Sequence, residues 1–201
     1  MTDFLYPFLE REEADLQTVL AEVEASTVQK GEDVIRLRRA IDLDAVAACA
    51  QDVRVRLERG RRLIAFGNGG SSTDAQDVVR DFVAVGWPAL ALTNDAATIT
   101  AIGNDVGYEN VFARQLIPLA RHDDVALAIS TSGSSPNIVV GLEEANRREL
   151  LTCAITGYGG GRLGELAWLD HLFVVEGDYI PRLQEAHATI YHLLLEAVGA
   201  P

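Results

Sequence analysis

The sequence predicts an α/β fold, in which a doubly wound parallel sheet of about five strands carries helices on both faces and a helical arm precedes it. Three observations lead to this prediction. From residue 62 onward, short apolar runs show no alternation with polar residues, which is typical of strands buried on both faces. Helical stretches separate these runs, as parallel strands require. Residues 1–60, in contrast, carry helical periodicity and no strand signal.

The N-terminal arm, residues 1–60, is expected to consist of two helices. Apolar residues recur at steps of three and four in both, and a polar segment at residues 29–33 is expected to break the pattern between them. Gly60 follows the second stretch as a C-terminal cap. The expected helices cover residues 9–26 and 43–60. We expect the arm to pack on the rest of the chain and its apolar stripe to serve in oligomerisation.

The remaining residues, 61–201, are expected to form one α/β domain in which strands and helices alternate. The expected strands are the apolar runs at 63–66, 89–92, 125–129, 151–155 and 171–175. The first expected helix runs from after residue 72 to about residue 83, and two more lie between residues 96 and 120. A further helix begins at Pro136, and the last covers about residues 181–198.

The net charge of the 201-residue chain is −13, from 17 Lys and Arg against 30 Asp and Glu. This charge argues against binding nucleic acid or anionic lipid through a general field. The apolar runs are far shorter than the ~20 residues of a membrane span, and the first residues lack the order of a signal peptide. Cys49 and Cys153 lie in apolar stretches, so we expect them in the core of a cytoplasmic protein.

The lysine content removes several chemistries. Lys30 is the only lysine, and it lies before every expected strand. Schiff-base enzymes, enzymes that use pyridoxal phosphate and Walker-A nucleotide binders all need a lysine at the site. The chain is therefore a poor candidate for each of these classes.

Two loops at the expected ligand-binding edge of the sheet carry no charge. Residues 67–72 and 130–135 contain only Gly, Asn, Ser and Thr, and each follows a strand and precedes a helix. Ligands of such sheets bind beyond the carboxyl ends of the strands. Glycines let the backbone approach a ligand, while hydroxyls and helix N-terminal N–H groups donate to an anion. The pair favours a phosphate or polyol site over ordinary turns, in which Gly and Ser are also common.

A dinucleotide site is the competing interpretation of the first loop. Gly67 and Gly69 match the first two glycines of the Rossmann fingerprint, but Ser72 stands at the third position. No acid closes the next strand, the nearest candidate being Asp95. This interpretation also leaves residues 130–135 unexplained.

Two expected helices carry groups suited to acid–base or metal chemistry. Asp74, Asp77 and Asp81 share one helix face, either as a solvated acidic face or as carboxylates that face the pocket. In the last helix, Gln184 and His192 lie eight residues apart, about 12 Å along the axis. We expect these two to reach a common ligand from opposite ends or from different subunits.

The order of motifs along the chain resembles a known family. The motifs are Gly-Asn-Gly-Gly-Ser at 67–71, Asp-Ala-Gln at 74–76, Leu-Thr-Asn-Asp at 92–95, Thr-Ala-Ile-Gly-Asn-Asp at 100–105, Ile-Ser-Thr-Ser-Gly-Ser-Ser-Pro-Asn at 129–137 and Arg-Leu-Gln-Glu-Ala-His at 182–187. Together they resemble the sugar isomerase (SIS) domain, and within it the phosphoheptose isomerases, which act on sedoheptulose 7-phosphate. The resemblance covers nearly the whole chain and implies a flavodoxin-like sheet.

The resemblance also implies how the substrate, a sugar phosphate, is bound. The Ser/Thr loop is expected to hold the phosphate, and the Asn-Gly-Gly loop, the segment at 94–95 and the last helix are expected to hold the sugar. The active sites are expected to lie between the subunits of a homotetramer. The implied binding residues are Asn68, Gly69, Gly70, Ser71, Asn94, Asp95, Ser130, Thr131, Ser132, Ser135 and Gln184.

The catalytic helix departs from the family pattern. Where the family has His-x-x-x-Glu, this chain has Asp77-x-x-x-Asp81, while Gln184 and His192 are retained. The resemblance implies Asp81 as the proton-transfer base, His192 as the second acid or base, and zinc held by Asp77, Asp81, Gln184 and His192. Asp77 has two interpretations, a zinc ligand or a neighbour that raises the pKa of Asp81. The shorter Asp81 places its carboxylate differently by about an ångström, which can cost ~100-fold in rate.

Two classes of function follow. The first is an aldose–ketose isomerase that converts sedoheptulose 7-phosphate to D-glycero-D-manno-heptose 7-phosphate through an enediol, with Asp81 and His192. The alternative is a non-catalytic SIS protein, either a partner-binding scaffold like the replication-initiator-associating protein or a sugar-phosphate sensor. That scaffold lacks both the helix carboxylate and the late histidine, so their retention here favours the enzyme.

Overall fold

Five parallel strands form one sheet in the computed structural model of the chain, which describes residues 16–177 and 179–201. The sheet has the order β2-β1-β3-β4-β5, which confirms the predicted doubly wound α/β class. The order reverses between β1 and β3, and ligands of such sheets bind at this switch point. The strands are β1 (Leu63–Gly67), β2 (Ala89–Ala91), β3 (Val125–Ser130), β4 (Leu151–Gly157) and β5 (His171–Val175).

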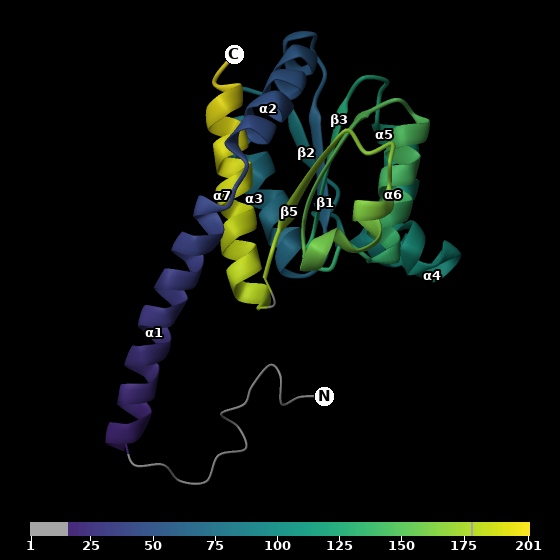
Figure 1. Ribbon diagram of the computed structural model, residues 1–201. Coiled ribbons are helices and arrows are strands. Elements are labelled where there is room, and N and C mark those ends of the chain that lie inside the picture. The colour runs from purple at the N-terminus through teal and green to yellow at the C-terminus, as the bar shows by residue number, and fades with distance from the viewer. Residues whose placement is uncertain (1–15, 178) are drawn as a thin grey trace.

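Helices cover both faces of this sheet (Figure 1). One face carries α2 (Leu43–Glu58), α3 (Gly70–Ala84) and α7 (Ile180–Val198), with α1 (Leu16–Arg39) attached to α7. The other face carries α4 (Ala96–Val106), α5 (Val111–Leu119) and α6 (Pro136–Arg147). Two 3₁₀ segments, η2 (Tyr108–Asn110) and η3 (Tyr158–Glu165), complete the connections.

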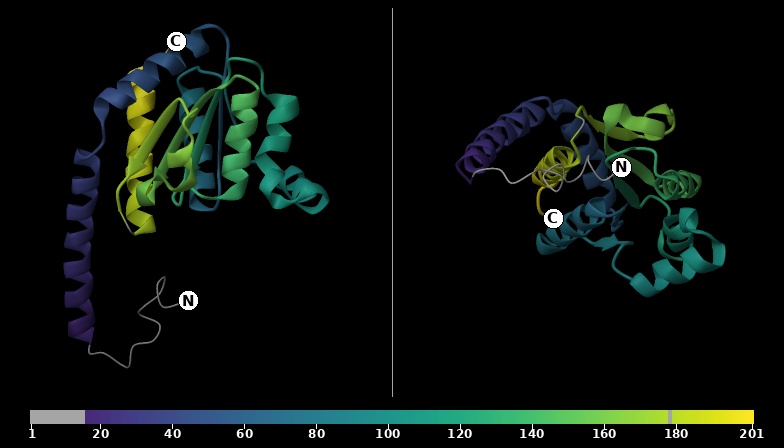
Figure 2. Two further views of the ribbon diagram at one scale, coloured as in Figure 1. Left: turned by 45° about the vertical axis from the view of Figure 1, so that its right-hand side comes forward. Right: turned by 90° about the horizontal axis from the view of Figure 1, so that it is seen from below.

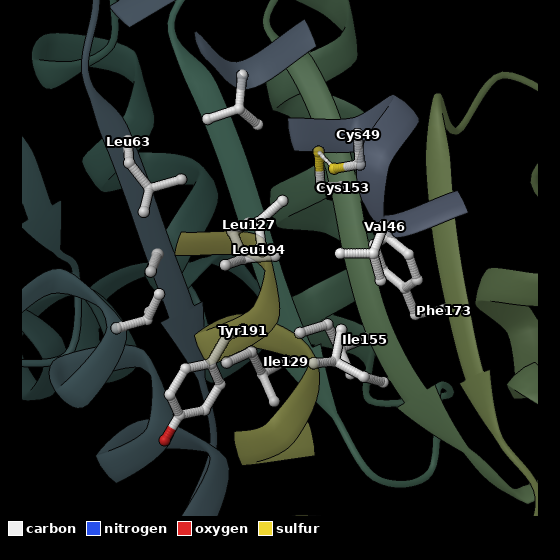
Figure 3. Close-up of a cluster of buried hydrophobic side chains, with 14 of the residues drawn as sticks. Val46, Cys49, Leu63, Leu127, Ile129, Cys153, Ile155, Phe173, Tyr191 and Leu194 are labelled. Atoms are coloured by element: carbon white, nitrogen blue, oxygen red, sulfur yellow. Dashed lines mark hydrogen bonds between the residues drawn. The ribbon is translucent and has the colours of Figure 1, made fainter. Parts of the chain in front are cut away.

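Every residue of β1, β3 and β4 is buried, which explains why these strands read as continuous apolar runs. Successive side chains point to opposite faces, so Leu63 packs in the core below α2 and α7, whereas Ile64 packs below α5 and α6. Cys49 and Cys153 lie in the first of these cores as free thiols, as expected, with their sulfur atoms 3.7 Å apart (Figure 3).

The arm differs from the prediction in its first helix. The expected break at residues 29–33 is wrong, because α1 runs without interruption from Leu16 to Arg39. Gln, Lys and Glu are good helix formers, and a single glycine costs only about 1 kcal/mol, so Gly31 does not end the helix. Residues 9–15 of the expected first helix lie outside the described part of the chain.

The last turn of α1 attaches the arm to α7. Leu37 is the one buried residue of α1, and Arg38 Nε donates to Thr189 Oγ1 at 3.0 Å. The rest of α1 runs away from the sheet (Figure 2) and exposes apolar side chains, among them Leu20 and Val23. Across residues 16–177 and 179–201, no helix is long and apolar enough to cross a membrane.

Candidate functional site

The loop from β1 to α3 is a tight turn that glycines make possible. A side chain at Gly67 would overlap the carbonyl group of Ser71, and Gly69, the N-cap residue of α3, has a φ of +55°. The strand therefore passes into the helix within two residues. The first N–H groups of α3 come to lie at the carboxyl edge of the sheet, where an anion is stabilised by the helix dipole.

The Ser/Thr loop from β3 to α6 is held from outside by the glycine-rich segment η3. Leu163 N donates to Gly133 O at 2.9 Å, and Arg162 N donates to Ser134 Oγ at 3.1 Å. Gly133 has a φ of +59°, and a side chain there would overlap the carbonyl oxygen of Gly160. Ser135 is the N-cap residue of α6, but its hydroxyl does not cap the helix. This loop therefore offers backbone N–H groups and hydroxyls without a carboxylate.

Two asparagines join these loops across the switch point. Asn68 Nδ2 donates to Asn137 Oδ1 at 2.9 Å, and Asn137 Nδ2 donates to Asn68 Oδ1 at 2.8 Å. The hydroxyl of Tyr108 donates to Asn68 Oδ1 at 3.3 Å. Asn68 was predicted from the sequence, but Asn137 and Tyr108 had no assigned role, because the reciprocal amide pair forms only where the two loops lie side by side.

A pocket of about 480 Å³ lies between α3 and α7. Gln184 lies directly against Gly70, where a side chain would overlap the Gln184 amide. Gln184 and His192 of the same chain both line this pocket. Their spacing along the helix had left open whether they meet within one chain or from different subunits. The lining residues are Gly70, Thr73, Asp74, Asp77, Pro181, Gln184, Glu185, Ala188, Tyr191 and His192.

The two expected catalytic side chains meet beside this pocket. His192 Nε2 lies 3.3 Å from Asp81 Oδ2, and the rings of His192 and Tyr191 contact edge to face with centroids 4.6 Å apart. On the other side of Asp81, Arg80 donates to Oδ1 from Nε at 3.2 Å and from Nη2 at 3.1 Å. Arg80 Nη1 also donates to Asp77 Oδ1 at 2.9 Å. One guanidinium therefore joins Asp77 and Asp81.

Two further groups of the pocket have shifted pKa values. Burial and the neighbouring charge of Asp77 raise the pKa of Asp74 to about 6, and Asp74 Oδ2 is buried with no hydrogen-bond partner. Burial, together with the charges of Asp74, Asp77 and Asp81, raises the pKa of the Tyr191 phenol. Asp74 was predicted to lie on the acidic face of its helix but was not among the predicted site residues. Tyr191 was not predicted either, because in the sequence it resembles one more apolar position of the last helix.

The segment at 94–95 lies in a different hollow. Asn94 and Asp95 line a pocket of about 430 Å³ between β2, α4 and α5, together with Arg114. Asp95 caps α4 by accepting hydrogen bonds from Thr98 N at 3.1 Å and Thr98 Oγ1 at 2.6 Å, and these bonds lower the pKa of Asp95. Within one chain, the structure therefore does not bring these two residues into the pocket that His192 lines.

The residues expected to bind zinc do not form a ligand set. Among the described residues, no three His, Cys, Asp or Glu side chains cluster in a way that would hold a metal ion. Asp77 and Asp81 direct carboxylate oxygens at Arg80, and His192 contacts Asp81. The side chains as they lie do not fit a zinc ion.

Comparison with known proteins identifies similar chains. A family model described as "SIS domain" matches residues 31–157. The phosphoheptose isomerase of Nitratidesulfovibrio vulgaris is 42% identical over 159 residues, 76% of this chain and 76% of that protein. A phosphoheptose isomerase structure from Francisella tularensis matches with a TM-score of 0.82 and 35% identity, covering 89% of this chain and 97% of the other. Another from Neisseria gonorrhoeae matches with a TM-score of 0.80 and 30% identity, covering 92% and 100%.

Proposed function

The chain belongs to the SIS (sugar isomerase) domain family, and we propose that it is an aldose–ketose isomerase that converts sedoheptulose 7-phosphate to D-glycero-D-manno-heptose 7-phosphate. The observation that carries the proposal is the pairing of Asp81 Oδ2 with His192 Nε2 at 3.3 Å, beside a pocket that Gln184 also lines. A carboxylate and an imidazole side by side are the groups that proton transfer between adjacent carbons and oxygens requires.

The phosphate is assigned to the Ser/Thr loop at the start of α6. Ser130, Thr131, Ser132 and Ser135 carry hydroxyls at the carboxyl edge of the sheet, in a loop without acidic residues. Hydroxyls, backbone N–H groups and the helix dipole together stabilise a phosphate group. The sugar is assigned to Asn68 and Gly69 on the loop from β1, to Gly70 and Ser71 in the first turn of α3, and to Gln184 on α7. Asn94 and Asp95, which lie in a separate hollow of the same chain, are assigned to the sugar as part of a site between subunits.

The reaction moves one proton between carbons and one between oxygens. The Asp81 carboxylate takes a proton from C1 of the ketose, while the C2 carbonyl oxygen receives a proton from His192, which gives an enediol. His192 then takes the proton from the C1 hydroxyl, and Asp81 returns its proton to C2. The product is the aldose, and both side chains regain their starting states. No electron leaves the substrate, so the reaction needs no redox cofactor.

Zinc is the part of the expected site that the donor set does not support. Asp77 Oδ1 and Asp81 Oδ1 accept hydrogen bonds from Arg80, and Asp81 Oδ2 lies against His192 Nε2, so the charge and three donor atoms of the expected ligand set already have partners. When bound in an isomerase site, zinc would polarise the substrate carbonyl.

The protein is further proposed to be a cytoplasmic homotetramer with active sites between subunits. Exposed apolar side chains along α1, where only Leu37 is buried, support assembly into an oligomer. The free thiols of Cys49 and Cys153 support a reducing compartment such as the cytoplasm. The division into a helical arm at residues 1–60 that serves in oligomerisation and a phosphosugar-binding domain at 61–201 is part of this proposal.

The direct test is incubation of the purified protein with sedoheptulose 7-phosphate, followed by nuclear magnetic resonance of the C1 and C2 protons. We expect an aldose 7-phosphate signal to grow until equilibrium. Calorimetric binding of the sugar phosphate without any conversion would contradict the isomerase and support a sensor. Absence of both binding and conversion would support a scaffold.

A further inference from the structure

Arg80 contacts two carboxylates through three separate nitrogen atoms. Nη1 lies 2.9 Å from Asp77 Oδ1, whereas Nη2 and Nε lie 3.1 Å and 3.2 Å from Asp81 Oδ1. A guanidinium is planar and carries five donors in a fixed arrangement. These three contacts therefore set the orientation of the Arg80 guanidinium and place its positive charge between the two carboxylates. The second Asp81 oxygen, Oδ2, stays turned toward His192.

This arrangement does what a bound cation would do at the same place. Asp77 and Asp81 lie one helical turn apart, and like charges at this spacing repel each other. Either a metal ion or a cationic side chain can neutralise them. The guanidinium and a metal ion would compete for the same two carboxylates, because a carboxylate whose charge is balanced by Arg80 attracts a second cation less strongly.

We propose that Arg80 takes the place of the metal ion in this chain, as the fixed positive charge that holds Asp81 with one oxygen directed at His192. Arg80 is thus a positioning residue, which acts on the substrate through Asp81. Its catalytic consequence rests on the proposed isomerase function, whereas its consequence for metal binding does not.

Because the Arg80 ion pairs are exposed, the effect of removing Arg80 on activity can be distinguished from an effect on folding. The side chains of Arg80 and Asp77 are 67% and 45% exposed, and ion pairs with such exposure add little to stability. Arg147 offers a control on α6: it is 66% exposed and pairs with Glu144, also three residues earlier, at 2.7 Å. Glu144 is only 11% exposed, but it keeps Arg148 as a second partner when Arg147 is removed. Replacing Arg80 with alanine should leave the midpoint of thermal unfolding nearly unchanged.

The first test measures zinc and needs no enzymatic activity. The full-length wild type, Arg80→Ala and Arg147→Ala are titrated with zinc chloride by calorimetry, and retained zinc is measured after dialysis. We expect Arg80→Ala to bind zinc at least about tenfold more tightly than the other two proteins, since the freed oxygens of Asp77 and Asp81 then become available beside His192. Wild-type binding equal to or tighter than that of Arg80→Ala would overturn the proposal.

The second test measures isomerase turnover. We expect Arg80→Ala to lower kcat by about 10-fold to 100-fold, Arg80→Lys to keep more of it, and Arg147→Ala to keep all of it. Guanidinium ions added to the buffer should restore part of the kcat of Arg80→Ala, whereas sodium ions at the same ionic strength should not. Unchanged kcat in Arg80→Ala would overturn the positioning role. A wild type without turnover would refute the isomerase instead, and the zinc comparison would still decide the proposal.

Discussion

His192 presents Nε2 to Asp81 at 3.3 Å, and this contact brings together two residues that lie far apart in the sequence. The helix α3 carries the carboxylate and α7 carries the imidazole, and the two helices pack together on one face of the sheet. The sequence predicted both residues because their types and order resemble the family. It did not predict Arg80, whose contacts depend on the side-chain rotamer and on aspartates at positions 77 and 81.

The role of His192 is tested by replacing it with alanine. Because an acid–base group contributes about 100-fold to 10,000-fold to a rate, we expect kcat for sedoheptulose 7-phosphate to fall by at least about 100-fold. His122→Ala is the control, since His122 is exposed and pairs with Glu149 at 2.9 Å. Equal turnover in His192→Ala and His122→Ala would remove His192 from the mechanism.

Among the elements, the first residue of every strand and the whole of β5 followed from the apolar runs, but the last residues of the other four strands did not. β3 extends to Ser130 and β4 to Gly157, because Ser130 pairs with Thr156 and Gly157 pairs with Val175 in neighbouring strands. Such pairing overrides the polar character of the residues, and a single sequence does not show it. In α1 the error went the other way. The polar residues and the glycine at 29–33 predicted a break, but they do not end the helix.

Only part of the candidate site was predictable from the order of strands, loops and helices. The loops at 67–72 and 130–135 were identified because strand, loop and helix follow one another in a fixed order. The Asn68–Asn137 pair and the separate hollow around Asn94 and Asp95 depend on how different loops pack against each other. Contacts of this kind join segments distant in the chain, so spacing alone carries no information about them.

The Ser/Thr loop should be sensitive to any side chain at Gly133. Its φ of +59° and its close approach to Gly160 predict that Gly133→Ala lowers the free energy of unfolding by about 1–2 kcal/mol or more. Displacement of the loop should also raise KM for the sugar phosphate. Chemical denaturation and initial-rate kinetics measure the two effects.

Gly31→Ala is the matched substitution for this loop test. Gly31 lies inside α1 with no atom near enough to meet a new side chain, so the change should stabilise the helix by about 0.5–1 kcal/mol and leave KM unchanged. If both alanine variants behaved alike, the constraint on the Ser/Thr loop would not exist.

At the scale of the whole molecule, buried ionisable groups link stability to pH. His187 on α7 is fully buried, neither ring nitrogen finds a hydrogen-bond partner with good geometry, and burial lowers the pKa of His187 to about 4. The backbone of Thr156 opposes this shift only in part. Between pH 4 and about 6.5 the unfolded chain binds a proton that the folded chain does not, so stability falls as the pH falls through this window.

This pH dependence is tested by comparing the wild type with His187→Gln at a fixed protein concentration. The advantage of the wild type in free energy of unfolding should be larger at pH 7 than at pH 4 by about 3 kcal/mol. Asp74 titrates in the same window with the opposite sign, because its raised pKa favours the folded state at low pH. It is present in both proteins and cancels in the difference. Parallel stability curves would show that His187 does not titrate as described.

Assembly is the second property of the whole molecule. Leu20 and Val23 on α1 are 56% and 55% exposed, and burial of such side chains between subunits favours association. We expect light scattering to give the mass of a tetramer for the wild type and a smaller species for Leu20→Glu with Val23→Glu. Identical masses for the two proteins would show that these side chains of α1 do not contribute to assembly.

Asp81 is proposed to take the proton from one sugar carbon and to return it to the next. The most direct measurement is the turnover of sedoheptulose 7-phosphate in deuterium oxide by the wild type, Asp81→Asn and Asp81→Glu, followed by nuclear magnetic resonance. We expect deuterium at C2 of the aldose for the wild type, because the proton on the Asp81 carboxyl exchanges with solvent before it is returned to the enediol. We expect a rate at least about 100-fold lower for Asp81→Asn. Asp81→Glu should retain or raise the activity, since it restores the longer carboxylate that the resemblance implies. Wild-type turnover rates in Asp81→Asn would contradict this role of Asp81.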